Sequence, residues 1–332
     1  MKFLIAGLGS IGRRHFRNLI ALGEKDIVLL RTRKSTLPDD ELAGYPVETD
    51  IHDALKKHKP DAVIVANPTS MHLDVAIPAA MSGCAILLEK PLSHSMDRLD
   101  QLRRAVKKSG SRVLVAFQFR FHPGLVRAKQ LINDGEIGRI LSVHVHFGEY
   151  LPAWHPWEDY RQGYAARADL GGGVVLTQCH SLDYLPWLAG KPVSVWGFTG
   201  KISDLEVDVE DTAKIGLRFE GGVLGSLHLD YNRQPPVHTL DVAGTAGSLK
   251  WNLADGAVHI YRAGSKTWEK YPLPANWERN VMFVEQMKHF IAVVRGDVEP
   301  SCTLEDGIRV QRLVFAVHES QNTGRVIDLK QD

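Results

Sequence analysis

Two charged residues and a proline follow a short apolar run in the first third of the chain. The run Ala85–Leu88 has the composition of a buried strand and ends in the tripeptide Glu89-Lys90-Pro91. A strand that leaves the core often ends in charged residues, and proline stops strand pairing, so the tripeptide has an ordinary structural explanation. The alternative is a lysine held at the carboxyl end of a parallel strand, where open α/β sheets bind their ligands. There its ammonium group would stabilise negative charge on a substrate oxygen.

A glycine-rich turn opens the chain. The sequence GLGSIG fits the pattern GxGxxG, between an apolar strand and a helical pattern. In this context Gly7 permits the tight turn, Gly9 lets a pyrophosphate approach the backbone, and Gly12 lets helix and strand pack closely. Backbone N–H groups at the helix start, with Ser10 and Ile11, would bind the phosphates. A glycine turn without a ligand is the alternative, and the strand and helix on either side make it the weaker one.

The end of the second predicted strand bears on the choice between NAD and NADP. An NAD site needs an acidic residue about 20 residues after the glycine turn, to bind the ribose hydroxyls. The chain reads Arg31-Thr32-Arg33-Lys34 there, with Thr32 at the expected acidic position. A 2′-phosphate is repelled by a carboxylate and binds arginine in a bidentate manner, so we predict NADP as the preferred cofactor, with NAD as the alternative. A solvated basic loop would show the same residues.

The elements that must position these residues alternate regularly between strand and helix up to about Phe121. Short, fully apolar strands separated by amphipathic helices predict a parallel sheet covered on both faces, and right-handed crossovers make it doubly wound. We therefore predict a dinucleotide-binding domain at residues 1–121. The predicted strands are Phe3–Ala6, Ile27–Leu30, Ala62–Val65, Ala85–Leu88 and Val113–Ala116, and the clearest helices are Ile11–Leu22, His72–Ser82 and Met96–Ser109.

The pattern changes after His122. One helix, Gly124–Asp134, is followed by strands that succeed one another without helices, which predicts an α+β domain at residues 122–332 with a large, mostly antiparallel open sheet. A last helix is marked by a capping box at Thr303 and Asp306, runs to about Asn322, and has Gly324 as its C-terminal cap. The predicted strands are Ile140–Phe147, Val193–Gly200, Thr212–Phe219, Gly222–Tyr231, His238–Gly244, Ser248–Asn252 and Ala257–Arg262.

Further motifs occur where the predicted strands and helices meet. They are NPTSMH (67–72), FQFR (117–120), GGGVVLTQCHSLD (171–183), EDG (305–307) and SQNTGRV (320–326). Together with Glu89-Lys90-Pro91 they resemble the glucose–fructose oxidoreductase, inositol dehydrogenase and rhizopine-catabolism (Gfo/Idh/MocA) family of sugar oxidoreductases. The resemblance extends over nearly the whole chain. It implies a Rossmann domain followed by a domain that binds the substrate and forms oligomers.

The resemblance implies roles for individual residues. Lys90 would reach the substrate oxygen and the nicotinamide ribose, and His180 would be the acid–base group. These roles are chemically reasonable, because hydride leaves a carbinol carbon only as the hydroxyl proton departs, and histidine titrates near working pH. A histidine that only packs its helix is the alternative for His180. The further cofactor-binding residues that we predict are Asn67, Pro68, His72, Glu89 and Gln118.

The sequence departs from the family pattern next to His180. Members commonly carry an aspartate four residues before the histidine, and here position 176 is Leu. Thr177 and Asp183 each lie three residues from His180, a spacing that puts side chains on one helix face. Either residue is therefore expected to orient the imidazole, and Thr177 is also a predicted substrate-binding residue.

Residues 150–167 form a segment rich in aromatic residues and arginine, between the motifs of the first predicted domain and the GGG turn. Sugars stack their apolar C–H faces on aromatic rings, and an anionic sugar also needs a planar cation. We predict that Trp154, Tyr164 and Arg161 bind the substrate here, together with Arg120. A packed crossover or a subunit contact is the competing interpretation. A similar segment in members linked to bacterial surface sugars favours an acidic or nucleotide-linked sugar.

Composition bounds the remaining possibilities. The net charge of +1 and the absence of a Lys/Arg-rich run argue against a nucleic-acid partner. Three scattered cysteines fit neither a disulfide framework nor a metal motif, so we expect no metal and a cytoplasmic location. No apolar stretch has the length of a membrane span.

We expect a homodimer or homotetramer formed through the second sheet. Besides a sugar dehydrogenase or reductase, a glycosidase with transient oxidation and a silent dinucleotide-binding regulator remain as alternatives.

Overall fold

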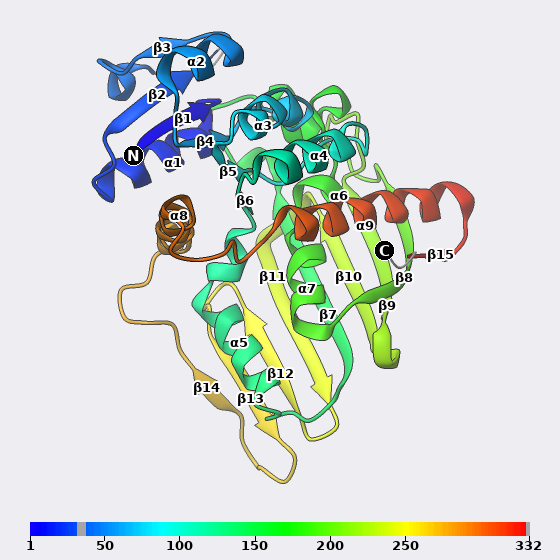
Figure 1. The fold of residues 1–332 in the computed structure, drawn as a ribbon. Coiled ribbons are helices and arrows are strands. Elements are labelled where there is room, and N and C mark those ends of the chain that lie inside the picture. The colour runs from blue at the N-terminus through cyan, green and yellow to red at the C-terminus, as the bar shows by residue number, and fades with distance from the viewer. Residues whose placement is uncertain (32–37, 330–332) are drawn as a thin grey trace. The chain divides into compact units, whose positions relative to one another are not determined.

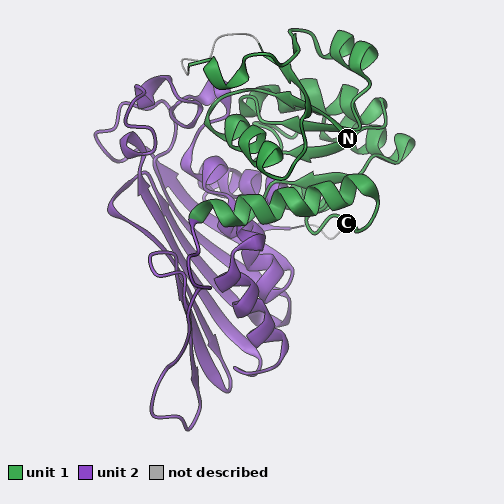
Figure 2. Cartoon of the chain, turned by 90° about the vertical axis from the view of Figure 1, so that its left-hand side faces the viewer, with its two compact units in different colours: residues 1–118, 279–309 green, residues 119–278, 310–332 purple. Residues whose placement is uncertain are grey.

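The computed structural model describes residues 1–31 and 38–329, which fall into two compact units (Figure 2). The first unit comprises Met1–Gln118 and Arg279–Arg309, and the second comprises Phe119–Glu278 and Val310–Asp332. The domain boundary predicted between residues 121 and 122 stays a prediction. A compact unit is a group of residues in contact, and it does not have to be a domain that folds independently.

The first unit is built on a six-stranded sheet in the order β3-β2-β1-β4-β5-β6, with every pair parallel (Figure 1). Its strands are β1 (Lys2–Ala6), β2 (Asp26–Leu30), β3 (Val47–Glu48), β4 (Ala62–Val65), β5 (Ala85–Leu88) and β6 (Val113–Val115), and its helices are α1 (Ser10–Ala21), α2 (Ile51–His58), α3 (His72–Met81), α4 (Leu99–Ser109) and α8 (Arg279–Arg295). This strand order is that of the doubly wound dinucleotide-binding fold, so the predicted fold class is confirmed.

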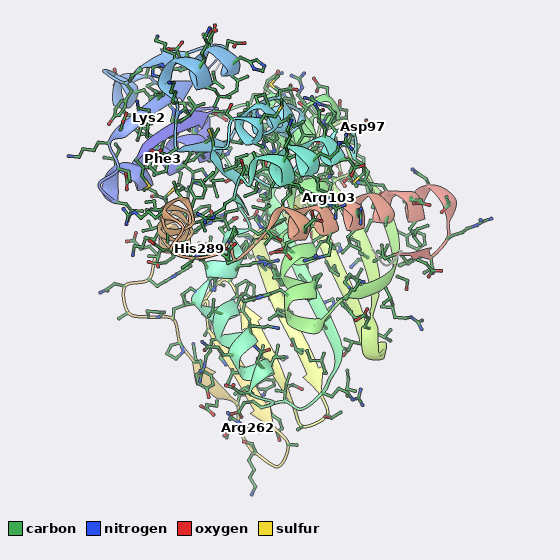
Figure 3. All side chains as sticks on the ribbon, in the orientation of Figure 1. Lys2, Phe3, Asp97, Arg103, Arg262 and His289 are labelled. Carbon is green, nitrogen blue, oxygen red and sulfur yellow. The ribbon has the colours of Figure 1, made fainter. Side chains whose placement is uncertain are left out.

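The apolar runs of the sequence form the centre of this sheet. Phe3 on β1 is fully buried, whereas its neighbour Lys2 at the strand start is partly exposed (Figure 3). Strands β4 and β5 are buried along their whole length, as expected for parallel strands covered on both faces. Helix α2 was not predicted; Asp50 caps it by accepting hydrogen bonds from the backbone N–H groups of His52 (2.8 Å) and Asp53 (2.9 Å).

A late segment of the chain completes the first unit. Helix α8 packs on α1, where the guanidinium carbon of Arg14 lies 4.4 Å from the ring centre of Phe283. Next along the chain, the carbonyl of Cys302 accepts a hydrogen bond from the N–H of Val115 (2.9 Å) on the edge strand β6. Gly307 also packs against β6, since a Cβ at this position would lie 3.0 Å from the Val115 side chain. Residues 279–309 are therefore part of this unit's core.

The second unit contains a nine-stranded sheet in the order β14-β13-β12-β11-β7-β10-β9-β8-β15. The neighbouring strands β7 and β10 run parallel and the other pairs are antiparallel, which confirms the predicted mostly antiparallel sheet. Its strands are β7 (Ile140–Tyr150), β8 (Pro192–Gly200), β9 (Thr212–Phe219), β10 (Leu224–Asp230), β11 (Asn232–Gly244), β12 (Gly247–Asn252), β13 (Val258–Arg262), β14 (Glu269–Tyr271) and β15 (Ile327–Asp328), and its helices include α5 (Pro123–Asn133), α6 (Val174–Thr177) and α7 (His180–Ala189).

Alternation along the strands gives this sheet two different faces. On β7, Val143 and Val145 are buried beneath the helices, while His144 is exposed and His146 half-buried on the opposite face. Helices α5 and α7 lie on the first face (Figure 1). We call the opposite face the outer face of the second sheet.

The last helix, α9 (Leu304–Thr323), begins with the predicted capping box. The Asp306 carboxylate accepts hydrogen bonds from the N–H (2.8 Å) and hydroxyl (2.9 Å) of Thr303, whose hydroxyl oxygen in turn accepts from the N–H of Asp306 (3.2 Å). Gly324 ends the helix at a positive φ of 66°. Among the residues that the structure describes, no helix is long and apolar enough to cross a bilayer.

Candidate active site

The glycine turn connects β1 to α1 at the carboxyl edge of the parallel sheet. Gly7 has a φ of 89°, and a Cβ there would lie 2.4 Å from the backbone nitrogen of Asn67, which follows β4. Strands β1 and β4 are neighbours at the point where the strand order reverses, the place at which open α/β sheets bind ligands. The turn therefore lies where a dinucleotide would bind.

Gly9 and Gly12 meet different surroundings. A Cβ on Gly12 would lie 2.0 Å from the carbonyl oxygen of Gly7, so only glycine lets α1 approach the turn this closely. A Cβ on Gly9 would meet nothing within 4 Å, which leaves room for a ligand against the backbone. Gly9 and Ser10 are exposed at the start of α1, whose first N–H groups have no partner within the helix. These residues fit a bound pyrophosphate.

His72 joins the loops that follow β4 and β5. Its Nδ1 lies 2.9 Å from the carbonyl oxygen of Pro91, and its Nε2 lies 2.9 Å from that of Asn67. Burial lowers the pKa of His72, against the opposing charge of Glu89. Since a neutral ring carries one N–H, it donates to one of the two carbonyls at a time. The predicted cofactor residues Asn67 and His72 are thus brought together, beside Pro68.

Glu89 is anchored from the opposite side. Its Oε1 lies 2.8 Å from Nε2 of His15 on α1, and both side chains are buried. Its Oε2 accepts a hydrogen bond from the N–H of Lys90 (3.2 Å). Lys90 is partly exposed and lies between two residues, Glu89 and Pro91, that contact α1 and the first residue of α3 respectively. The backbone that carries the lysine is therefore fixed on both sides.

The predicted 2′-phosphate residues Thr32 and Arg33 lie outside the described residues. On either side of that gap, the Arg31 guanidinium donates to Asp39 (2.8 Å), and Arg13 donates to Glu41 (2.9 Å). The hydrogen bond from Arg31 lowers the pKa of Asp39. Gln118, the last predicted cofactor residue, is buried at the end of the first unit.

In the second unit, His180 is the first residue of α7, after α6 has ended at Thr177. The helical pattern of the sequence is thus two helices with a break before the histidine. His180 is 5% exposed, and its ring meets that of Phe119 edge to face at 5.0 Å.

The two residues expected to orient His180 have other partners. The Asp183 carboxylate is paired with Arg120, whose Nη2 donates to Oδ1 (2.6 Å) and whose Nε donates to Oδ2 (3.0 Å). Both side chains are almost fully buried. The hydroxyl of buried Thr177 donates to the carbonyl of Gly173 (2.9 Å) and is hydrogen-bonded to the hydroxyl of Tyr231. Arg120 and Thr177, both predicted to bind substrate, thus have structural partners within the second unit.

The segment at residues 150–167 forms a series of single 3₁₀ turns. Trp154 is half-buried, with its ring edge-on to that of Tyr231 at 5.6 Å, and Tyr164 is also half-buried. Arg161 donates to both oxygens of Asp159 and to Glu206 (2.9 Å). Two carboxylates therefore balance the charge that was predicted to bind an anionic sugar.

Glu210 is a half-buried carboxyl group beside the GGG turn that the sequence interpretation missed. Its Oε1 accepts a hydrogen bond from the N–H of Val175 (3.2 Å) at the start of α6, and a Cβ on Gly173 would lie 2.5 Å from the same oxygen. Burial raises the pKa of this carboxyl group to about 7. No sequence signal links Glu210 to the GGG turn, since the two are about 35 residues apart. His15 could have been noticed, because it is a polar residue on the buried side of α1.

We predict that Gly12→Ala and Gly9→Ala separate folding from cofactor binding. Gly12→Ala should lower the melting temperature, since overpacking costs about 1–3 kcal/mol. Gly9→Ala should leave the melting temperature unchanged and weaken NAD(P)H binding by about tenfold or more, a loss of at least ~1.4 kcal/mol. Circular dichroism and fluorescence titration measure the two effects. Wild-type affinity in Gly9→Ala would show that the turn does not hold the pyrophosphate.

Glu210 should make stability depend on pH. Below its ordinary pKa of 4.5, the carboxyl is protonated in both states; between 4.5 and about 7 the unfolded chain ionises first, so the folded state loses stability as pH rises. Glu210→Gln should therefore raise the melting temperature above pH 7 and change it little below pH 4.5, with a gain on the order of 1–3 kcal/mol. The exposed control Glu220→Gln should show no such pH dependence. An equal gain at both ends of the range would contradict this account.

Comparison with known proteins assigns both parts of the chain to the same family of oxidoreductases. Residues 1–117 match the family described as "Oxidoreductase family, NAD-binding Rossmann fold", and residues 125–250 match the "GFO/IDH/MocA C-terminal domain". D-xylose 1-dehydrogenase (NADP(+)) 2 of Haloferax volcanii is 26% identical over 99% of this chain and 100% of its own length. Myo-inositol 2-dehydrogenase of Thermotoga maritima is 24% identical over 100% of this chain and 99% of its own.

A solved structure shows the same fold. The WlbA dehydrogenase from Bordetella pertussis, in complex with NADH and UDP-GlcNAcA, superimposes with a TM-score of 0.84 and 23% identity, over 100% of this chain and 99% of that one. The two family matches together cover most of the chain, and its glycine turn and Glu89-Lys90-Pro91 lie at the sheet edge where the fold binds its cofactor. The chain belongs to the Gfo/Idh/MocA family of NAD(P)-dependent oxidoreductases.

Proposed function

We propose that the protein transfers a hydride between NAD(P) and a hydroxyl or keto carbon of a sugar or sugar derivative. The observation that carries this proposal is the fixed backbone at Lys90, which follows β5 at the sheet edge that also holds the glycine turn. A regulator that only bound the cofactor would not need a lysine held in this way. Relatives named for dehydrogenation of D-xylose and myo-inositol support a polyhydroxylated substrate.

The chemistry divides between two side chains. The bound nicotinamide supplies or accepts the hydride. Lys90 places its ammonium against the substrate oxygen and lowers the energy of the charge that develops there. His180 takes the hydroxyl proton during oxidation and returns it during reduction. Glu89 and His15 act indirectly, because they fix the backbone next to Lys90. The Arg120–Asp183 pair acts in the same indirect way on α7, the helix that begins with His180.

The substrate class is proposed to be an acidic or nucleotide-linked sugar. The UDP-GlcNAcA complex of WlbA is the supporting comparison. Trp154 and Tyr164 are half-buried and offer ring surface to a sugar face. To bind a carboxylate or phosphate of the substrate, Arg161 must first release its hydrogen bond to Asp159 or Glu206. The aromatic residues therefore carry more of this proposal than Arg161 does.

The outer face of the second sheet is proposed to join subunits into a dimer or tetramer. Phe198 on β8 and Leu224 on β10, the two strands that flank β9, are 60% and 54% exposed. Large exposed apolar side chains of this kind are typical of self-association surfaces.

The catalytic assignment predicts that Lys90→Ala and His180→Ala each lower kcat by about 10²–10⁴-fold, the range for one acid–base or electrostatic group. The fold and cofactor affinity should survive. Turnover is followed by nicotinamide absorbance, after a screen of sugars and nucleotide sugars with both cofactors. His52→Ala and Lys56→Ala, on the exposed side of α2, are the matched controls. Near wild-type turnover in His180→Ala would remove the histidine from the mechanism.

Cofactor selectivity is proposed to favour NADPH over NADH in kcat/KM. Arg33→Ala should narrow the preference, since it removes a bidentate partner of the 2′-phosphate, and Thr32→Asp should narrow or reverse it. Steady-state kinetics with both cofactors test this. A wild type that prefers NADH, with a ratio that neither change alters, would contradict the proposal.

A further inference from the structure

Three metal-ligating side chains gather on the outer face of the second sheet. They are His146 on β7 and His228 and Asp230 on β10, and their ligand atoms all lie within 4.8 Å of one another. Strands β7 and β10 are the parallel pair of this sheet, and their register places His228 opposite His146 and Asp230 opposite Gly148. The parallel pairing thus brings together residues that are far apart in the sequence.

The distances suit a tetrahedral ion. Oδ2 of Asp230 lies 3.0 Å from Nε2 of His228 and 3.4 Å from Nε2 of His146. Bonds of about 2.0–2.2 Å to a tetrahedral zinc-type ion separate neighbouring ligand atoms by roughly 3.3–3.6 Å. The two distances to Asp230 are therefore close to those between ligands of one ion, and the two imidazole nitrogens lie no more than 4.8 Å apart.

The glycine at position 148 leaves room for the Asp230 carboxylate. Asp230 is 3% exposed, and its Oδ1 accepts a hydrogen bond from the N–H of Asn232 (3.0 Å), which turns Oδ2 toward the histidines. A Cβ at Gly148 would lie 2.5 Å from Oδ2, so any other residue at this position would displace the ligand.

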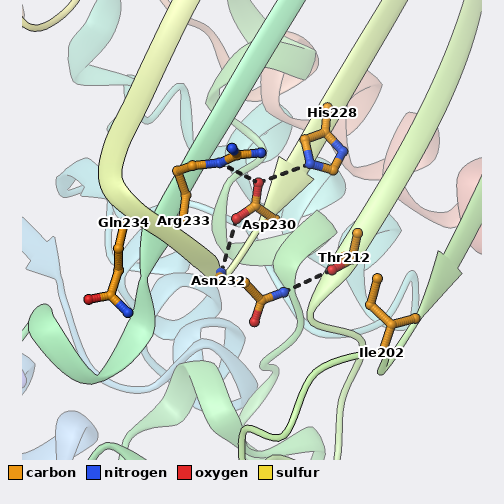
Figure 4. Close-up of a pocket in the computed structure, with 7 residues that line it drawn as sticks. All are labelled: Ile202, Thr212, His228, Asp230, Asn232, Arg233 and Gln234. Atoms are coloured by element: carbon orange, nitrogen blue, oxygen red, sulfur yellow. Dashed lines mark hydrogen bonds and ion pairs between the residues drawn. The ribbon is translucent and has the colours of Figure 1, made fainter.

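A pocket of about 250 Å³ opens beside the carboxylate (Figure 4). It is lined by Ile202, Thr212, His228, Asp230, Asn232, Arg233 and Gln234. This space admits water or another small ligand at the fourth coordination position. Nε of Arg233 lies 3.7 Å from Oδ2 of Asp230, and its side chain is 41% exposed. Its guanidinium supplies positive charge when no ion is bound and has room to move outward.

We propose that His146, His228 and Asp230 form a binding site for a divalent transition ion of the zinc type on the outer face of the second sheet. The ion would join β7 to β10 and hold the β10–β11 connection at Asn232. The site belongs wholly to the second unit and includes none of the residues assigned to hydride transfer. The metal-site proposal is therefore independent of the proposed hydride transfer.

Titration of the purified, tag-free protein with Co²⁺ and Zn²⁺ tests the site. One ion per chain should bind, Co²⁺ should show the visible absorption of tetrahedral coordination, and Zn²⁺ should raise the melting temperature. His228→Ala and Asp230→Asn should each weaken binding by at least the about 10–100-fold that loss of an outer-shell partner costs. His144→Ala is the matched control, because His144 lies on the same face of β7, hydrogen-bonded to Ser226 (2.8 Å) outside the triad.

A fourth variant separates coordination from folding damage. Arg233→Gln removes the competing charge and should tighten Zn²⁺ binding severalfold, a gain that a disrupted fold cannot produce. The proposal is overturned if the wild type binds neither ion at micromolar concentrations. It is also overturned if His228→Ala binds the ion with the same affinity and stoichiometry as the wild type and the control His144→Ala. In that case the three side chains form a hydrogen-bonded group and nothing more.

Discussion

The approach of α1 to the turn after β1 is the constraint on which the cofactor side of the molecule depends. The helix comes so close at Gly12 that no side chain fits between it and the Gly7 carbonyl. This position aims the helix start at the proposed phosphate site, and one turn later it brings His15 to Glu89. The same helix also carries Arg13 to Glu41, beside the loop that follows β2. A single close contact thus fixes how α1 reaches the glycine turn, Glu41 and Glu89.

Much of this arrangement could be predicted from the sequence, because fully apolar runs of four or five residues have few other ways to be buried. The strands β1, β2, β4 and β5 were located to within one residue for this reason. The helix α2 was missed because it is short and buries only two residues, and α8 because its buried side includes the polar Gln286. Local pattern is a weak guide where packing partners lie far away in the chain.

Side-chain partners were the least predictable feature. Helical spacing suggested Thr177 or Asp183 as the residue that orients His180, but it gave no sign that Arg120, 63 residues earlier, donates to both oxygens of Asp183. Arg161 was predicted to bind an anionic substrate group, and nothing in the sequence indicated its hydrogen bonds to Asp159 and Glu206. An arginine that binds substrate and one that closes a salt bridge look identical in a sequence, since the difference lies in which carboxylate the fold brings near.

The return of residues 279–309 to the first unit has a consequence for how the protein is made. During translation, the glycine turn, Glu89 and Lys90 leave the ribosome long before α8 and the strand-pairing carbonyl of Cys302 exist. The nascent chain must therefore hold an unfinished first unit, with the edge strand β6 incompletely paired, while about 160 residues of the second unit are synthesised. Unpaired edges are where chains aggregate, so chaperones would have their longest opportunity to bind during that interval.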